Sequence, residues 1–291
     1  MRIERVGIVG CGVMGSGIGQ VCAQAGFEVV ISEKDEITLS RGMTTIRKAL
    51  RRVEDRGKVS KSTRQSILRR ISGTMEIKDF RTCDLVIECV TEDLGLKKHI
   101  FHTLDEVCQR DAVLATNTSV LSIGEMAGST TRPDKVIGTH FLTPAPVNNL
   151  LEIVVTVQTS EDTLRTVKQF AETVGKTIVV AKDKPGFVVN RVLTSIMLNA
   201  VRLLEEGVAT KEDIETAMEI GLGLPMGPLK LLDLIGIDTV VLGSEALFRE
   251  LNEQQYSPPV TLRRMVGDGL LGRKTGKGFY EYPDSPGTGA E

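Results

Sequence analysis

The sequence of 291 residues is poor in aromatic side chains and has no surplus of charge of either sign. It contains no tryptophan, and aromatic residues make up 4% of the chain. The 36 Lys and Arg residues nearly balance the 38 Asp and Glu residues, which leaves a formal net charge of −2. Such a balance offers no broad basic surface for a nucleic-acid backbone or an acidic membrane. We therefore expect neither nucleic acid nor membrane among the partners of this chain.

Long apolar runs and patterned cysteines are also missing. No stretch approaches the ~20 consecutive apolar residues that span a bilayer. The first residues enter a strand pattern at once, without the regions of a cleavable signal peptide. The cysteines form no CxxC unit and have no metal-ligand spacing. They are Cys11, Cys22, Cys83, Cys89 and Cys108. This usage predicts buried, reduced thiols, no metal site and a cytoplasmic protein.

Short apolar runs alternate with longer helical patterns through the first half of the chain. The predicted strands are 6–9, 28–32, 85–89, 113–116 and 136–139, with 150–157 and 177–180 extending the same sheet. The predicted helices between them are 16–25, 38–56, 95–109 and 161–173. Continuous apolar runs are typical of a parallel sheet that is buried on both faces. The pattern therefore predicts an α/β fold with a Rossmann-type, doubly wound sheet.

The pattern changes at KDKPGF, residues 182–187. Beyond it the chain shows helical periodicity and almost no strand signal. The candidate helices there are 188–206, 211–220, 228–235 and 239–251. We therefore predict a nucleotide-binding domain over 1–184 and an all-α domain over 185–282. The tail 283–291 has no apolar anchors and is predicted to be disordered.

The first predicted strand runs directly into a GxGxxG motif and then a helix, in the segment GIVGCGVMGSGIG. Gly10 allows the tight turn, Gly12 lets the backbone approach a pyrophosphate, and Gly15 lets helix and strand pack closely. Val13 and Met14 lie between these glycines, at the start of the helix. Its free N–H groups and dipole favour the phosphates of a dinucleotide.

The second predicted strand is followed by Glu33, which lies 23 residues after the first glycine of the motif. A carboxylate at this point suits both hydroxyls of the adenine-side ribose and repels a 2′-phosphate. The sequence therefore favours NAD as cofactor. Because Lys34 is adjacent and could accommodate a phosphate, NADP stays open.

The chain has three histidines, and one of them lies where the sheet meets the ligand crevice. His99 and His102 fall in a polar helical stretch and are most simply solvated. His140 ends an apolar strand, and twelve residues later Glu152 interrupts the apolar run LLEIVV. Alone, these two read as a core histidine and a strand-end charge. Together, beside a dinucleotide fold, they suggest a base and the group that orients it.

The chain also resembles the 3-hydroxyacyl-CoA dehydrogenases, which include bacterial 3-hydroxybutyryl-CoA dehydrogenases. The resemblance covers nearly the whole chain. Its signatures, in order, are GCGVMGSGI, ATNTSVLSI, GTHFLTPAPVNNLLEIV, DKPGFVVNRVL, MGPLKLLDLIGIDT and GRKTGKGFYEY. It implies NAD-dependent oxidation of (S)-3-hydroxyacyl-CoA to 3-ketoacyl-CoA, or the reverse reduction. It also implies a homodimer formed through the C-terminal domain.

The resemblance assigns catalytic roles to four residues. It makes His140 the general base for the 3-hydroxyl proton, with Glu152 fixing its tautomer and stabilising the imidazolium. Ser119 and Asn190 would hydrogen-bond the reacting oxygen. Asn190 follows the predicted domain boundary, so domain closure could complete the site.

Further residues match the family's cofactor contacts. Glu92 and Lys97 correspond to positions that touch the nicotinamide half of NAD, as does Ser119. From their own pattern, Glu92 and Lys97 read as exposed charges at a helix start. The sequence has HFLTP where the family usually has HFFNP, so Thr143 replaces an asparagine that contacts the nicotinamide ribose region. Thr is shorter and cannot make the paired contacts of an amide.

A basic run between residues 47 and 58 is the candidate site for the CoA phosphates, with Arg52 and Arg56 as the predicted contacts. Such a run is also typical of a solvated helix face. Ala49 replaces a serine that helps to bind CoA in some relatives. Asn148 and Asn149 stand where the family often has Met-Lys.

Two other functions fit parts of this pattern. Carnitine dehydrogenases and the lambda-crystallin/gulonate dehydrogenase group resemble the same family and act on hydroxy acids without CoA. Such an enzyme would not need a basic helical arm, which this chain has. An NAD-binding structural protein without catalysis, as in lens crystallins, would have a damaged catalytic set, and here the set is intact.

Overall fold

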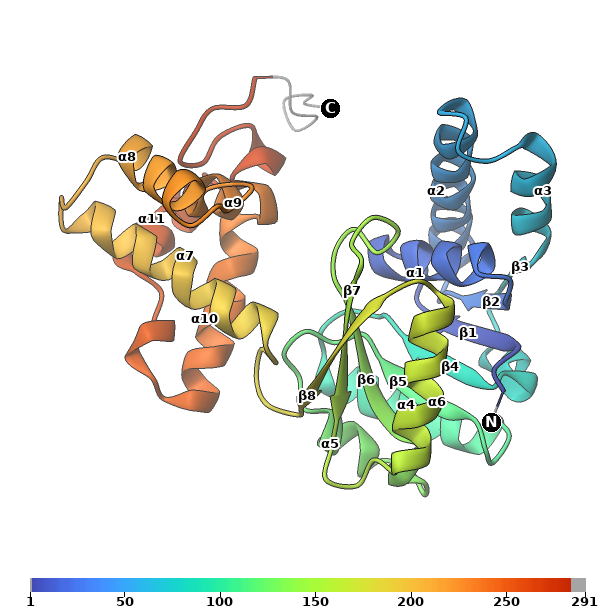
Figure 1. Ribbon diagram of the computed structural model, residues 1–291. Helices are drawn as coiled ribbons and strands as arrows, with labels where there is room; N and C mark the ends of the chain where they lie inside the picture. The colour runs from blue at the N-terminus through green and yellow to red at the C-terminus, as the bar shows by residue number, and fades with distance from the viewer. Residues whose placement is uncertain (1, 284–291) are drawn as a thin grey trace. The chain divides into compact units, whose positions relative to one another are not determined.

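The computed structural model describes residues 2–283, which form parts of two compact units, Met1–Phe187 and Val188–Glu291. Figure 1 shows a sheet flanked by helices in the first unit and a group of helices in the second. The predicted Rossmann-type domain followed by a helical domain is thereby confirmed. Of the tail that we predicted to be disordered, residues 284–291 lie outside the described residues.

An eight-stranded sheet organises the first unit. Its strands are β1 (Arg5–Val9), β2 (Glu28–Ser32), β3 (Ile71–Thr74), β4 (Leu85–Glu88), β5 (Val113–Thr116), β6 (Val136–Phe141), β7 (Leu150–Val155) and β8 (Thr177–Lys182). Their spatial order is β3-β2-β1-β4-β5-β6-β7-β8. Neighbouring strands are parallel except β6 and β7, which are antiparallel. The strand order reverses between β1 and β4. In open α/β sheets, ligands bind at such a switch point, beyond the carboxyl ends of the strands.

Helices cover both faces of this sheet. They are α1 (Val13–Gln24), α2 (Glu36–Asp55), α3 (Lys61–Arg69), α4 (Leu94–Val107), α5 (Ile123–Ala127) and α6 (Glu161–Thr173). Side chains of α1 and α6 pack on one face, and those of α4 and α5 pack on the other. In Figure 1, α2 and α3 stand beside each other and extend beyond the sheet.

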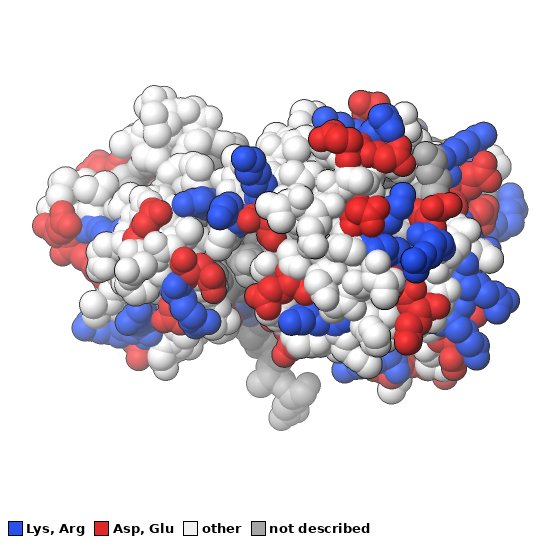
Figure 2. Space-filling view, turned by 90° about the horizontal axis from the view of Figure 1, so that it is seen from below, with Lys and Arg blue, Asp and Glu red and all other residues white. Residues whose placement is uncertain are grey.

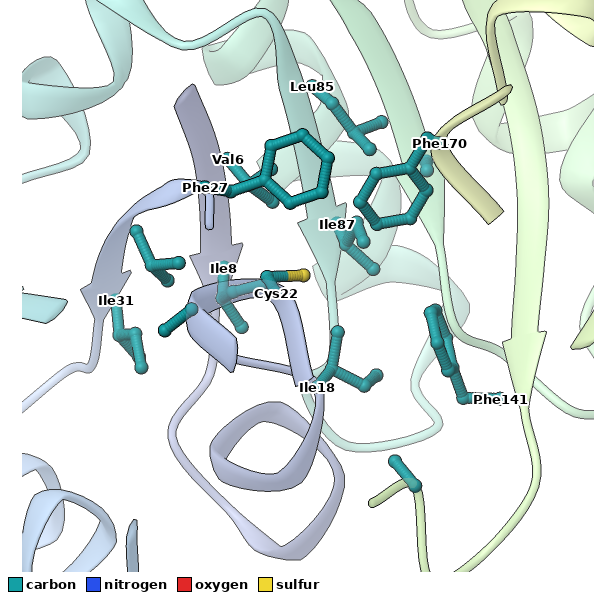
Figure 3. Packing of buried hydrophobic residues seen from close by; sticks show 14 of the residues in the cluster. Val6, Ile8, Ile18, Cys22, Phe27, Ile31, Leu85, Ile87, Phe141 and Phe170 are labelled. Carbon is teal, nitrogen blue, oxygen red and sulfur yellow. The ribbon is translucent and has the colours of Figure 1, made fainter. Parts of the chain in front are cut away.

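One core lies between the sheet and helices α1 and α6 (Figure 3). Ile18 and Cys22 of α1 meet Ile8 of β1, and both α1 residues are fully buried. Phe27 and Phe170 close this core, with their ring centroids 5.4 Å apart. Burial of such side chains fixes α1 on the sheet and so positions the loop that precedes it.

The predicted elements agree with the structure where the apolar pattern is strong. Strands 28–32 and 113–116 and helix 161–173 have the predicted bounds. The apolar pattern did not predict β3, an edge strand whose sequence ISGT has a single apolar residue. It also missed α3, α5 and the last helix of the second unit, which are short.

The second unit is helical. Its helices are α7 (Val189–Glu205), α8 (Lys211–Thr216), α9 (Pro228–Ile235), α10 (Ile237–Leu251) and α11 (Val260–Gly267), with a π-helical turn at Ala217–Gly221. Leu198, Leu229 and Leu232 lie at the centre of its core and are fully buried. The buried Asp233 carboxylate accepts hydrogen bonds from the backbone N–H groups of Phe279 and Tyr280, which holds the last described segment on α9.

The five cysteines are free, and all but Cys89 are buried. Burial raises the pKa of the Cys22 thiol to about 12, and burial with the nearby Glu33 carboxylate raises the pKa of Cys11 to about 11. These thiols are thus protonated at neutral pH, as predicted for packing residues. Within residues 2–283, no helix is long and apolar enough to cross a membrane. Figure 2 shows Lys and Arg side chains interspersed with Asp and Glu on the face it displays.

Candidate active site

The loop between β1 and α1 forms an open cradle for an anion. Gly10 has φ +98°, a conformation that favours glycine. A Cβ at Gly15 would collide with the carbonyl oxygen of Gly10, whereas a Cβ at Gly12 would meet nothing within 4 Å. No side chain caps the first turn of α1. The turn, the close packing and the open approach predicted for this motif are all present, and they fit the pyrophosphate of NAD.

Glu33 follows β2 and is tied to the same loop. Its Oε2 accepts a hydrogen bond from the backbone N–H of Cys11 at 2.9 Å, and its Oε1 accepts one from Lys34 N at 2.9 Å. The carboxylate therefore lies beside the Gly-rich loop, at the carboxyl end of the neighbouring strand. Its predicted contact with the ribose hydroxyls remains a prediction.

His140 and Glu152 face each other across β6 and β7. The two residues are direct partners in the antiparallel register, so their side chains lie on the same face of the sheet. His140 Nδ1 is 2.7 Å from Glu152 Oε2, and the side chains are 5% and 0% exposed. Because a carboxylate only accepts hydrogen bonds, Nδ1 donates and Nε2 keeps the lone pair. The imidazole is thus arranged to take a proton at Nε2.

Two further side chains hold His140 in place, and neither was predicted from the sequence. The Asn117 side chain accepts a hydrogen bond from Phe141 N at 2.9 Å and so fixes the end of β6. The Phe187 ring lies against the imidazole, with ring centroids 5.6 Å apart, and is buried. No sequence pattern around Asn117 or Phe187 predicts these roles, because each role depends on a partner that is distant in sequence.

Ser119 lies on the loop after β5, and Glu92 holds that loop. Glu92 Oε1 accepts a hydrogen bond from Ser119 N at 2.8 Å, and its Oε2 accepts one from Thr118 Oγ1 at 2.8 Å. The Glu92 side chain is 42% exposed, whereas Lys97 is 1% exposed and pairs with Glu88 Oε1 at 2.7 Å. The interpretation of Glu92 and Lys97 as exposed helix-start charges is therefore wrong for Lys97. Direct contact of either with NAD remains a prediction.

The remaining predicted residues lie in three places. Thr143 Oγ1 is 3.0 Å from Met14 Sδ, so Thr143 lies beside the start of α1. Arg52 is exposed in the last turn of α2, and Arg56 is the residue at its C-cap. Asn190 is half-buried near the start of α7, in the second unit. Their roles toward the cofactor, CoA and substrate stay predictions.

The loops that follow β1, β2, β4, β5 and β6 therefore all begin at the carboxyl ends of these parallel strands. This end of the sheet holds the phosphate cradle, the carboxylates of Glu33 and Glu92, and the buried His140–Glu152 pair. Two family matches account for this arrangement. The 3-hydroxyacyl-CoA dehydrogenase NAD-binding domain matches residues 5–184, and the C-terminal domain of the same family matches residues 186–282. The chain belongs to the 3-hydroxyacyl-CoA dehydrogenase family. It is an NAD-dependent oxidoreductase, as the resemblance implied.

Individual members of the 3-hydroxyacyl-CoA dehydrogenase family are similar over almost their full length. The 3-hydroxybutyryl-CoA dehydrogenase of Mycobacterium tuberculosis is 45% identical over 96% of this chain and 99% of its own. The mitochondrial hydroxyacyl-coenzyme A dehydrogenase of Homo sapiens is 38% identical over 96% of this chain and 91% of its own. The crystal structure of the (S)-3-hydroxybutyryl-CoA dehydrogenase from Ralstonia eutropha has a TM-score of 0.94 and 39% identity, covering 97% of this chain and all of that one.

Proposed function

We propose that the chain catalyses the NAD-dependent oxidation of (S)-3-hydroxyacyl-CoA to 3-ketoacyl-CoA, and the reverse reduction, with 3-hydroxybutyryl-CoA as a substrate. The observation that carries the proposal is the buried His140–Glu152 pair, which lies at the ligand edge of a sheet with a dinucleotide loop. The names of the similar dehydrogenases support the choice of thioester. This reaction belongs to fatty acid metabolism.

His140 is the proposed general base. Its Nε2 takes the proton of the 3-hydroxyl group during oxidation and returns it during reduction. Glu152 holds the ring through Nδ1 and stabilises the imidazolium that forms, at a site where both side chains are buried. When bound, the nicotinamide of NAD accepts or donates the hydride at C3 of the substrate. Ser119 and Asn190 are proposed to hydrogen-bond the reacting oxygen.

The cofactor is proposed to lie along the carboxyl edge of the sheet. Gly10, Gly12 and the start of α1 would bind the pyrophosphate, and Glu33 would bind the ribose and exclude a 2′-phosphate. Glu92, Lys97, Thr143 and Met14 would surround the nicotinamide half. The exposed Arg52 and Arg56 at the end of α2 would bind CoA phosphates.

The test is oxidation of NADH at neutral pH with acetoacetyl-CoA, with acetoacetate and dehydrocarnitine as controls and NADPH as the alternative donor. Rapid turnover with the thioester alone is expected. Turnover of a free acid but not of the thioester would assign the chain to the hydroxy-acid dehydrogenases. If no substrate is turned over although NADH binds, the chain does not catalyse this dehydrogenase reaction.

A homodimer formed through the second unit is also proposed. Large apolar side chains are more densely exposed in that unit, among them Ile220, Leu222, Leu242 and Val260. A shared interface would bury such side chains. Sedimentation at micromolar concentration should give twice the chain mass, and a monomer would contradict the proposal.

The free cysteines support a reducing compartment, and we propose the cytoplasm, which cell fractionation would test.

A further inference from the structure

The carboxyl end of β4 contains a buried carboxylate, Glu88, to which the proposed mechanism assigns no role. Glu88 is the last residue of β4, and its side chain is 0% exposed. Lys97 reaches it from α4 and is 1% exposed. Burying an ion pair is costly, and apolar residues of similar volume often stabilise a fold as well. The corresponding end of the neighbouring β1 is Val9, an apolar residue. Stability alone therefore does not explain this pair.

Each carboxylate oxygen of Glu88 holds a different loop. Oε1 accepts hydrogen bonds from Val90 N at 2.6 Å and from Lys97 Nζ at 2.7 Å. Oε2 accepts one from Thr116 Oγ1 at 2.7 Å, and the backbone oxygen of Glu88 accepts one from Asn117 N at 2.8 Å. Glu88 thus joins the loop after its own strand, the start of α4 and the loop after β5.

The contacts continue from this carboxylate to the proposed oxygen-binding residue. Thr116 Oγ1 accepts a hydrogen bond from Thr118 N at 3.1 Å, and Thr118 Oγ1 donates to Glu92 Oε2 at 2.8 Å. Lys97 Nζ is also 3.6 Å from Glu92 Oε2. Glu92 in turn accepts from Ser119 N at 2.8 Å. Two routes therefore lead from Glu88 to Glu92 and on to the Ser119 backbone, one through Thr116 and Thr118 and the other through Lys97 of α4.

We propose that Glu88 is a positioning residue. Its charge is neutralised by Lys97, and its contacts hold Glu92 and the Ser119 loop in the arrangement that catalysis requires. This inference rests on the proposed function, in which Ser119 contacts the reacting oxygen. Displacement of a site by about 1 Å costs on the order of 100-fold in rate. Loss of contacts that orient metal-ligating residues costs about 10- to 100-fold in affinity or activity, and we expect a loss of similar size here.

The chain offers a matched control pair at the opposite edge of the sheet. Asp105 of α4 pairs with Arg132, which precedes β6, at 2.6 Å, and both side chains are 5% exposed. Like Glu88, Asp105 also accepts a backbone hydrogen bond, from Thr131 N at 2.7 Å. Asp105→Asn therefore removes the same kind of buried charge without touching the Ser119 loop.

The experiment compares Glu88→Gln, Asp105→Asn and the double variant Glu88→Gln/Lys97→Met in the full chain. Melting temperature, kcat and KM for acetoacetyl-CoA, and hydrogen exchange of the Ser119 amide are measured for each. Glu88→Gln is expected to lower kcat about 10-fold or more, to change KM less than about threefold, and to speed Ser119 exchange. Asp105→Asn should lose thermal stability alone. The double variant should regain stability but keep the fast Ser119 exchange, a readout that does not depend on the proposed contact of Lys97 with NAD.

Wild-type kcat and unchanged Ser119 exchange in Glu88→Gln would overturn the inference. Equal losses of kcat in Asp105→Asn would do so too, because the effect would then follow general destabilisation. Recovery of kcat in the double variant would also overturn it, because Glu88 would then serve only to neutralise the charge of Lys97. Should the wild-type protein turn over no thioester, the proposed function fails, and Ser119 exchange still decides whether Glu88 positions this loop.

Discussion

The ring of Phe187 lies against the imidazole of His140, and its backbone has a conformation that residues other than glycine rarely adopt. Phe187 has φ +46°, and its ring centroid is 5.6 Å from that of His140. A bulky residue in the left-handed region is strained, and such strain concentrates at functional sites. Phe187 is also buried, in the apolar cluster that includes Ile123 and Ala181. Its side chain therefore keeps water from one face of the base.

The strain predicts an unusual order of stability for two truncations. Phe187→Gly and Phe187→Ala both remove the ring, but glycine relieves the positive φ. We expect Phe187→Gly to be the more stable variant by about 1 kcal/mol, in urea unfolding of the two proteins. Both should lose turnover, because the imidazole becomes solvated. A more stable alanine variant would show that the left-handed conformation carries no strain.

The His140–Glu152 pair predicts that His140→Gln loses turnover while it still binds cofactor. Removal of a general base typically lowers kcat by about 100- to 10,000-fold. The Gly10 loop is untouched, so the Kd for NADH, measured by fluorescence, should stay within about threefold of the wild-type value. Near-normal turnover would contradict the assignment of the base.

Glu152→Gln keeps the shape of that pair and tests the tautomer. An amide can donate to Nδ1, which would place the ring proton on Nε2 and block proton transfer from the substrate. We therefore expect kcat to fall by a factor of similar size to that of His140→Gln. A variant with unchanged kcat would show that the carboxylate does not control the tautomer.

Much of this site follows from the sequence, since its signals are local. The GxGxxG loop has a strand before it and a helix after it, and these elements lie where the apolar pattern predicts them. His140 and Glu152 lie in apolar strands, where a titratable side chain is costly without a partner. Their pairing was therefore predictable, although the antiparallel register that joins them was not.

The supporting residues were not predictable, because their roles arise from contacts between distant segments. Glu88 reads as an ordinary strand end until Thr116 and Lys97 surround it. Lys97 reads as an exposed helix charge, since nothing local shows that α4 turns it toward β4. The edge strand β3 escaped detection for a similar reason, because its pairing with β2 compensates for a weak apolar pattern.

The position of Glu33 predicts how the chain distinguishes NADH from NADPH. Glu33→Ala removes the carboxylate proposed to bind the ribose and repel a 2′-phosphate. Kd should rise much more for NADH than for NADPH, and titration of both dinucleotides would measure this. Glu33→Gln is the control, because it can still accept the hydrogen bond from Cys11 N. Equal weakening of both dinucleotides by Glu33→Ala would refute the ribose contact.

The exposed arginines at the end of α2 predict a change in KM without a change in kcat. Arg52→Ala and Arg56→Ala should each raise KM for acetoacetyl-CoA by roughly 3- to 10-fold, as expected for loss of about 1 kcal/mol of charge-assisted contact. Because the contact is electrostatic and exposed, the difference from wild type should shrink as salt is added. Arg81 is also exposed but lies in the 3-10 helix before β4, so Arg81→Ala is the control and should leave KM unchanged. If neither α2 variant differs from that control at low salt, the basic face of α2 is solvated, and CoA binds elsewhere on the chain.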